Sequence, residues 1–166
     1  YLFLDGARLG YGLAAPDNDL TLPDIAALCD VFYIGGTKVG ALFGEAVVIK
    51  NPELAQDFRY LIKQNGGMLA KGRLLGLQFD ALFTDGLYQE ISAHAIAMAE
   101  KLREAFTAKG YTYLAPNRTN QIFVIVPDAH LAKISEQFEY SYDQRIDATH
   151  SCVRFCTSWA TKEENV

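Results

Sequence analysis

The chain has 166 residues, of which 50% are hydrophobic and 21% charged, and its formal net charge is −5. This composition supplies enough apolar side chains for a buried core and argues against a disordered chain. An acidic chain also lacks the positive surface expected of a nucleic-acid-binding protein. The longest strongly apolar run, Ala46 to Ile49, is far too short to span a membrane. Three cysteines without metal-ligand spacing favour a reduced, cytoplasmic protein.

Hydrophobic runs separated by turn residues predict strands and helices in alternation over the first half of the chain. We expect Tyr1–Leu4 to be a central strand of a parallel sheet, apolar on both faces. Two more strands are predicted over Val31–Ile34 and Glu45–Lys50. Helices are expected over Leu9–Ala14, from the capping residue Thr21, from Asn51 to about Gln64, and after Gly67 as far as Phe83.

The second half begins with a long amphipathic helix, predicted from Tyr88 to about Lys109 and ended by Gly110. Beyond it the pattern is one of short strands, over Tyr111–Leu114, Gln121–Val126 and Cys152–Thr157, with a helix over Ala129–Phe138. We therefore expect an α/β portion over residues 1–86, a linking helix over 87–110 and a small α+β domain over 111–166. The abrupt strand at one end and the short helix at the other lead us to expect a segment of a longer chain.

Three charged residues stand at positions that can carry chemistry. Asp5 ends the first predicted strand, Lys38 follows the second in a glycine-rich bend, and Arg154 lies inside the last strand. Taken singly, they read as a turn former, a solvated cation and a surface ion-pair partner. Taken together, they match what pyridoxal phosphate chemistry requires. Because ligands of open α/β sheets bind beyond the carboxyl ends of strands, we expect Asp5 and Lys38 to face one crevice.

Each of these groups has a distinct role in that chemistry. A lysine amine forms a Schiff base with the cofactor aldehyde, and desolvation lowers its pKa enough to leave it nucleophilic. A carboxylate facing the pyridine nitrogen keeps that nitrogen protonated, so the ring can accept electrons. An arginine fork holds a substrate carboxylate through two parallel hydrogen bonds and so orients the substrate.

Longer motifs resemble those of the threonine aldolase family, which is close to the β-eliminating lyases that cleave tyrosine or tryptophan. The similar stretches are Leu4-Asp5-Gly6-Ala7-Arg8-Leu9, Gly36-Thr37-Lys38-Val39-Gly40-Ala41, Arg59 to Gly72, and Val153-Arg154-Phe155-Cys156-Thr157-Ser158-Trp159. The resemblance covers essentially the whole chain. It implies a pyridoxal-phosphate enzyme of the aspartate-aminotransferase-like fold (fold type I), here represented by part of the major domain and the small C-terminal α+β domain.

Site roles are carried over from the family to matching positions. The resemblance implies that Lys38 is the Schiff-base lysine and that Asp5 is the partner of the pyridine nitrogen. Arg8 and Arg154 would bind the substrate carboxylate. Thr37 would touch the cofactor phosphate. Where the family commonly has an arginine after its Gly-Met pair this chain has Leu69, so Lys71 or Arg73 would take over that phosphate contact.

The implied activity is cleavage of L-threonine or L-allo-threonine to glycine and an aldehyde, in a homodimer or homotetramer without a bound metal, nucleic acid or membrane. The family's phosphate cup and ring-stacking histidine precede the Asp-Gly-Ala-Arg strand, and His94, His130 and His150 do not replace them. The base for the β-hydroxyl stays unassigned.

Two alternatives stay open. One is another pyridoxal-phosphate enzyme of the same fold, such as an aminotransferase or a β-eliminating lyase. The other is a non-catalytic fragment.

Overall fold

The computed structural model describes residues 1–166. The chain divides into two compact units, each described here by itself. The first comprises Tyr1–Leu13 and Asn18–Ile91, and the second comprises Ala14–Asp17 and Ser92–Val166. Strands and helices are mixed in both units, as the sequence predicted.

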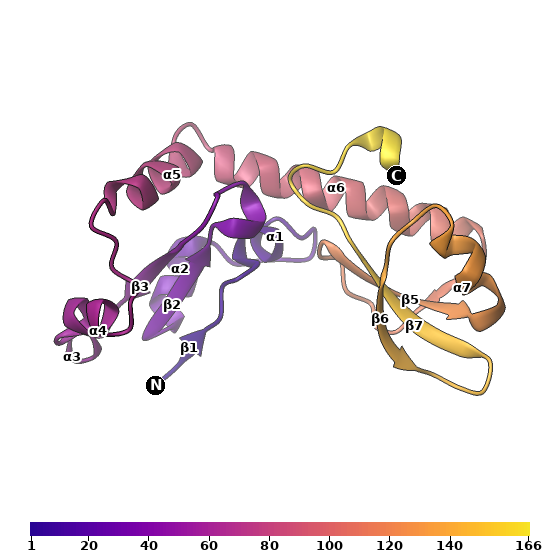
Figure 1. The fold of residues 1–166 in the computed structure, drawn as a ribbon, viewed down its shortest axis with the longest axis horizontal. Helices are drawn as coiled ribbons and strands as arrows, with labels where there is room; N and C mark the ends of the chain where they lie inside the picture. Colours follow the sequence, from indigo (N-terminus) through magenta and orange to yellow (C-terminus); the bar gives the residue numbers. More distant parts are fainter. The chain divides into compact units, whose positions relative to one another are not determined.

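The first unit is built on a three-stranded sheet in the order β1-β2-β3 (Figure 1). Its strands are β1 (Phe3–Leu4), β2 (Val31–Gly35) and β3 (Glu45–Ile49). β1 runs parallel to β2, with Leu4 opposite Phe32, whereas β3 runs antiparallel to β2, with Ile34 opposite Ala46. The central strand is therefore β2, and its alternate residues Phe32 and Ile34 are buried.

Within residues 1–166, the run Tyr1–Leu4 does not form a central strand. Only Phe3 and Leu4 pair with another strand, and they do so at one edge of the sheet. The side chains of Tyr1, Leu2 and Phe3 are 89%, 54% and 61% exposed, because no element of residues 1–166 lies against that edge. The apolar composition of this run indicates how strongly it favours burial, but it does not determine which strand occupies the centre.

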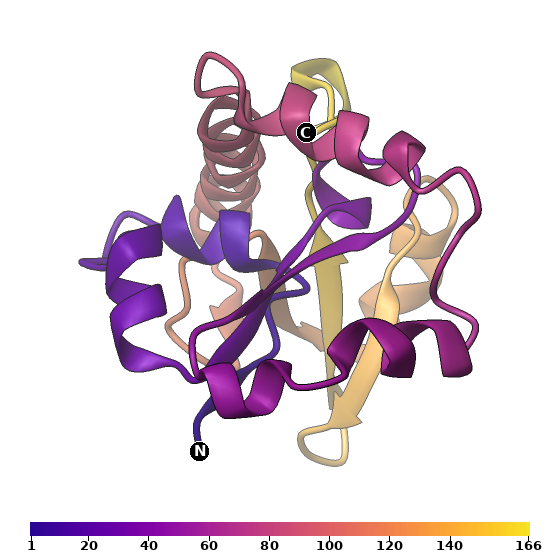
Figure 2. The same cartoon turned by 90° about the vertical axis from the view of Figure 1, so that its left-hand side faces the viewer.

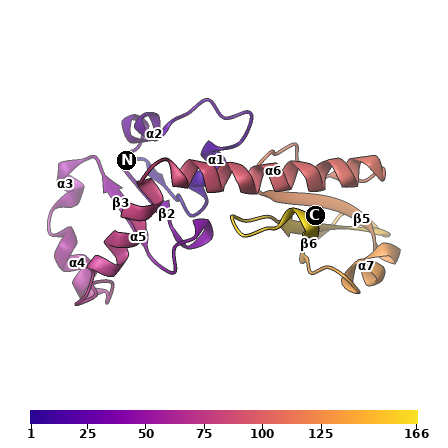
Figure 3. The ribbon, with the colours of Figure 1, turned by 90° about the horizontal axis from the view of Figure 1, so that it is seen from above.

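Helices lie on both sides of this sheet, with α2 on one side and α4 and α5 on the other (Figures 2 and 3). The helices of the unit are α1 (Leu9–Leu13), α2 (Leu22–Leu28), α3 (Pro52–Ala55), α4 (Phe58–Gln64) and α5 (Arg73–Phe83). Thr21 caps α2 in a reciprocal capping box with Asp24, as its residue types predicted. The single helix expected from Asn51 to Gln64 is broken, because Asp57 adopts a left-handed conformation with φ 58° between α3 and α4.

The long helix α6 (Leu87–Ala108) begins in the first unit and continues into the second. It ends at Ala108, and the predicted capping residue Gly110 follows with a φ of 81°, a left-handed conformation that favours glycine. No helix combines the length and the apolar composition that crossing a membrane requires.

The second unit holds a four-stranded antiparallel sheet in the order β4-β5-β7-β6. Its elements are β4 (Thr112–Tyr113), β5 (Gln121–Pro127), α7 (Asp128–Ser135), β6 (Ser141–Arg145), β7 (His150–Cys156) and a 3₁₀ turn, η2 (Glu163–Asn165). Ala99 of α6 packs against the fully buried face of this sheet, formed by Ile122, Val124, Val126 and Val153. The opposite face of β5 carries Gln121, Phe123 and Ile125, which are only partly buried.

Candidate active site

Asp5 lies at the end of β1, beside Tyr33 of β2. The parallel register that places Leu4 opposite Phe32 brings the next residues of the two strands together. The Tyr33 hydroxyl donates a hydrogen bond to Asp5 Oδ1, and the backbone N–H of Ala7 donates to the same oxygen at 3.0 Å. The hydrogen bond from Tyr33 and then that from Ala7 lower the pKa of Asp5, against a smaller opposing effect of burial. Asp5 is therefore an ionised carboxylate at neutral pH.

Two glycines bring the segment that follows β1 and the last residue of β2 into direct backbone contact. The N–H of Gly35 donates to the carbonyl oxygen of Gly6 at 2.9 Å. A Cβ atom at Gly6 would lie 1.6 Å from the carbonyl oxygen of Tyr33, and one at Gly35 would lie 2.6 Å from that of Ala7. Only glycine fits at either position, so the chain's own backbone explains these glycines. The contact fixes Asp5 relative to the bend that carries Lys38.

Lys38 lies in a single 3₁₀ turn, η1 (Thr37–Val39), directly after β2. The turn is closed by the carbonyl oxygen of Gly36, which accepts from the N–H groups of Val39 and Ala41 at 3.0 Å each. The Tyr11 hydroxyl donates to the carbonyl oxygen of Lys38 and so anchors the turn to α1. The Lys38 side chain is exposed and forms no hydrogen bond or ion pair.

Four charged groups act on one another around this turn. The charges of Lys38 and Arg8 both contribute to the low pKa of Asp5. Glu45, the first residue of β3, experiences the charges of Lys38 and Asp5. Burial raises the pKa of Glu45, while a backbone hydrogen bond from Gly36 and the charge of Lys38 oppose that rise. The structure thus brings together three of the predicted site residues, Asp5, Arg8 and Lys38, and adds Glu45.

A glutamine from α5 holds the loop that follows Lys38. Gln78 Oε1 accepts from the backbone N–H of Leu42 at 2.6 Å. Gln78 Nε2 donates to the carbonyl oxygen of Phe43 at 3.3 Å and to that of Leu74, on its own helix, at 3.2 Å. Helix α5 therefore holds the loop at Leu42 and Phe43, on the C-terminal side of Lys38.

Sequence reasoning missed Tyr33, Tyr11, Glu45 and Gln78. A signal existed for Tyr33 alone, because parallel pairing of the first two strands in register puts it next to Asp5. The other three residues act through contacts between distant segments, which no local pattern reveals.

The two residues assigned to the cofactor phosphate differ in their placement. Thr37 is exposed in the same turn as Lys38. Lys71 lies in the segment between α4 and α5, is exposed, and forms no hydrogen bond or ion pair. The structure brings Thr37 to the site, and nothing in it connects Lys71 to the other site residues.

Arg154 lies on β7 in the second unit, on the face of the sheet opposite the buried core. Its Nη1 donates to Gln121 Oε1 at 3.2 Å and its Nη2 to Ser141 Oγ at 3.4 Å. Its Nε is buried without a hydrogen-bond partner. The predicted arginine is thus half-buried, paired only with neutral groups, and not in the surface ion pair that an isolated strand arginine usually forms.

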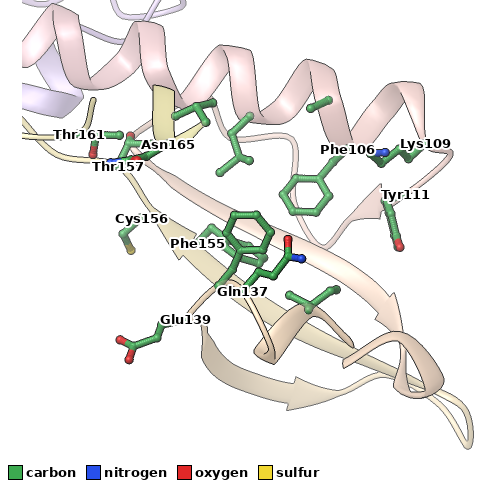
Figure 4. Close-up of a pocket in the computed structure, with 15 residues that line it drawn as sticks. Phe106, Lys109, Tyr111, Gln137, Glu139, Phe155, Cys156, Thr157, Thr161 and Asn165 are labelled. Atoms are coloured by element: carbon green, nitrogen blue, oxygen red, sulfur yellow. The ribbon is translucent and has the colours of Figure 1, made fainter. Parts of the chain in front are cut away.

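The second unit also contains a cavity of about 470 Å³ beneath α6 (Figure 4). Its walls are mainly apolar and include Leu102, Phe106, Ile134, Phe138 and Phe155. None of the six predicted site residues lines it. The cavity is therefore not the active site predicted from the sequence.

The residues of the first unit fit pyridoxal phosphate. Both hydrogen bonds to Asp5 reach Oδ1, so Oδ2 can accept from a protonated pyridine nitrogen. The carboxylate is ionised, as that contact requires. The Lys38 amine forms no hydrogen bond or ion pair, and its charge contributes to the lowered pKa of Asp5.

Comparisons with known proteins agree with these residues. A low-specificity L-threonine aldolase of a Pseudomonas species is 31% identical over 99% of the chain, and that of Pseudomonas aeruginosa is 28% identical over 100%. The solved structure of Leishmania major threonine aldolase superposes with a TM-score of 0.96 and 46% identity over 99% of the chain. No protein-family profile matches.

The chain spans 47% of the length of the two curated relatives and 48% of the Leishmania protein. The matches cover almost the whole chain, and their sequence identity and TM-score are higher than a shared fold alone would give. Residues 1–166 are therefore homologous to the threonine aldolases.

Proposed function

We propose that the protein is a pyridoxal-phosphate-dependent carbon–carbon lyase that cleaves L-threonine and L-allo-threonine to glycine and acetaldehyde. The observation that carries this proposal is the ionised Asp5 carboxylate, fixed by Tyr33 and Ala7 beside the charge of Lys38. Homology to enzymes named threonine aldolases supports the choice of reaction. The same homology supports a fold type I architecture, with residues 1–86 in the major domain and 111–166 in the small domain.

In this proposal Lys38 holds the cofactor through its amine and Asp5 holds a proton on the pyridine nitrogen. When bound, pyridoxal phosphate supplies a conjugated ring that accepts the electron pair of the broken Cα–Cβ bond. The ring accepts electrons more readily when its pyridine nitrogen is protonated. The fixed negative charge of Asp5 would stabilise that proton and so favour cleavage. Thr37 and Lys71 are our candidates for the phosphate.

Arg8 and Arg154 are the proposed ligands of the substrate carboxylate. The side chain of Arg8 forms no hydrogen bond or ion pair within the chain, and that of Arg154 has only neutral partners. Both guanidinium groups therefore keep their charge for an anionic ligand, and that of Arg8 also keeps its donors. A carboxylate held in this way orients the scissile bond and restricts the substrate before the reaction.

We propose that the protein self-associates as a homodimer or homotetramer. Many large apolar side chains of the first unit are exposed, among them Leu42, Tyr60, Leu61, Leu74 and Leu77. Exposed apolar surface of this extent commonly mediates association. The free thiols of Cys29, Cys152 and Cys156 fit a reducing compartment, and we place the protein in the cytoplasm.

The test is a product assay on the purified full-length protein supplied with pyridoxal phosphate. We expect equimolar glycine and acetaldehyde from L-threonine, and loss of both products in Lys38→Ala. Lys63→Ala, which removes an exposed lysine on α4, should leave the rate unchanged. Release of a keto acid without glycine would instead indicate an aminotransferase or an eliminating lyase, and no product from any β-hydroxy amino acid would refute the proposal.

A further inference from the structure

Arg154 is held between two neighbouring strands by uncharged acceptors. Ser141 of β6 lies directly opposite Arg154 in the strand register, and Phe123 of β5 lies opposite it on the other side. Gln121, two residues from Phe123 on the same face of β5, reaches Arg154 diagonally at 3.2 Å. The guanidinium is thus bound from both sides within the sheet.

This arrangement is unusual for an arginine that is not fully exposed, because such a charge is normally paired with a carboxylate. The nearest acidic residue on the neighbouring strand is Asp143, at the bulge of β6, and its charge acts on the thiol of Cys152. Asp143 forms no ion pair with Arg154. The Nε of Arg154 is also buried without a partner, so the group retains a donor as well as its charge.

We propose that Gln121 is a positioning residue that fixes the guanidinium of Arg154 while leaving its positive charge available to the carboxylate of a ligand. An amide oxygen can accept from the guanidinium as a carboxylate oxygen would, but it contributes no negative charge. A glutamate at the same position would form an ion pair with Arg154 and compete with the ligand. This inference rests on the proposed function, which supplies the carboxylate ligand.

The test compares binding of glycine with binding of glycinamide, which lacks the carboxylate, by calorimetry on the full-length protein with its cofactor. Q121E should weaken glycine binding at least about tenfold, because a charge-assisted contact is neutralised. Glycinamide binding should change less than about twofold. The matched control is Q137E, which adds the same charge at an exposed glutamine after α7 and outside the sheet, and which should alter neither ligand by more than about twofold.

A second variant guards against misfolding of Q121E. Q121A removes the acceptor without adding charge, and it should weaken glycine binding about two- to fivefold with glycinamide unchanged. Equal effects on glycine and glycinamide, or equal effects of Q121E and Q137E, would overturn the inference, as would a wild-type protein that binds no glycine.

Cleavage of L-threonine by the wild-type protein is measured in parallel, so that the two proposals can fail separately. If the protein releases no acetaldehyde and yet Q121E weakens glycine binding selectively, the proposed function is wrong and the role of Gln121 stands. If the protein cleaves L-threonine and Q121E binds glycine normally, the role of Gln121 is wrong. In the active protein Q121E should raise KM at least about tenfold and change kcat by less than about twofold.

Discussion

The Tyr33 hydroxyl donates a hydrogen bond to the Asp5 carboxylate, joining two strands whose residues are 28 positions apart in the sequence. This bond is the largest cause of the low pKa of Asp5, and Asp5 is in turn the largest cause of the raised pKa of Tyr33, about 12. Each group therefore favours the protonation state that the other needs, a neutral phenol and an ionised carboxylate.

Replacing Tyr33 by Phe should raise the pKa of Asp5 towards its ordinary value of 3.8, because the principal stabilising donor is lost. Titration of the Asp5 carboxyl carbon by NMR measures this shift directly. The Ala7 N–H bond stays in place, so part of the depression should persist. Tyr60→Phe, which alters an exposed tyrosine of α4, is the control; an equal change of the Asp5 pKa there would contradict the account.

The same pair predicts two pH limits for its contribution to stability. Asp5 has a lowered pKa in the folded protein, so its contribution is present above pH 3.8 and is lost as the pH falls through the lowered value. Tyr33 has a raised pKa, so its contribution is complete below pH 10.0 and is lost as the pH rises towards about 12. Burial also raises the pKa of Tyr88 to about 12, so ultraviolet titration should show two tyrosines ionising near the upper limit in the wild-type protein and only one in Tyr33→Phe.

Alanine at Gly6 should destabilise the first unit by at least about 2 kcal/mol, because its Cβ cannot coexist with the Tyr33 carbonyl. Thermal or denaturant unfolding measures the loss. Gly12→Ala is the matched control in the neighbouring helix α1, where a Cβ meets nothing within 4 Å. That substitution should be neutral or stabilising, by up to about 1 kcal/mol. Similar destabilisation by both would argue against the backbone contact between Gly6 and β2.

Gln78→Met should free the loop that follows Lys38 while preserving the volume of the side chain. The N–H of Leu42 loses its only acceptor from α5, at 2.6 Å, so its hydrogen exchange should accelerate by about tenfold or more. Exchange measured by NMR or mass spectrometry tests this. Gln64→Met, at the end of α4, should leave the Leu42 amide unaffected. If exchange at Leu42 does not change in Gln78→Met, the supporting role of α5 is wrong.

Local signals were sufficient for most elements of the fold. The capping residue Thr21 marked the start of α2, Gly110 marked the end of α6, and a continuous apolar run from Ile122 to Val126 marked β5. Strand β6 (Ser141–Arg145) was missed because all five of its residues are exposed, so it lacks the hydrophobic alternation by which strands are recognised. The break at Asp57 was missed because it involves neither glycine nor proline.

In the candidate site, too, some features could be predicted from local sequence and others could not. The positions of Asp5 and Lys38 after adjacent strands predicted that they would face one crevice; the charge of Lys38 contributes to the lowered pKa of Asp5, and their shared role in a site stays a prediction. Their supporting residues, Tyr11 and Gln78, come from elements whose packing is set by the whole unit. Lys71 was assigned from family resemblance alone, and its role stays a prediction.

The most direct test of the central claim is borohydride reduction of the protein with pyridoxal phosphate, followed by peptide mapping. If Lys38 holds the cofactor with Asp5 at the opposite end of the ring, a pyridoxyl group should appear on the peptide that contains Lys38, and Asp5→Ala should shift the absorbance of the bound cofactor without moving the attachment point. A pyridoxyl group on another lysine, or on none, would contradict the account.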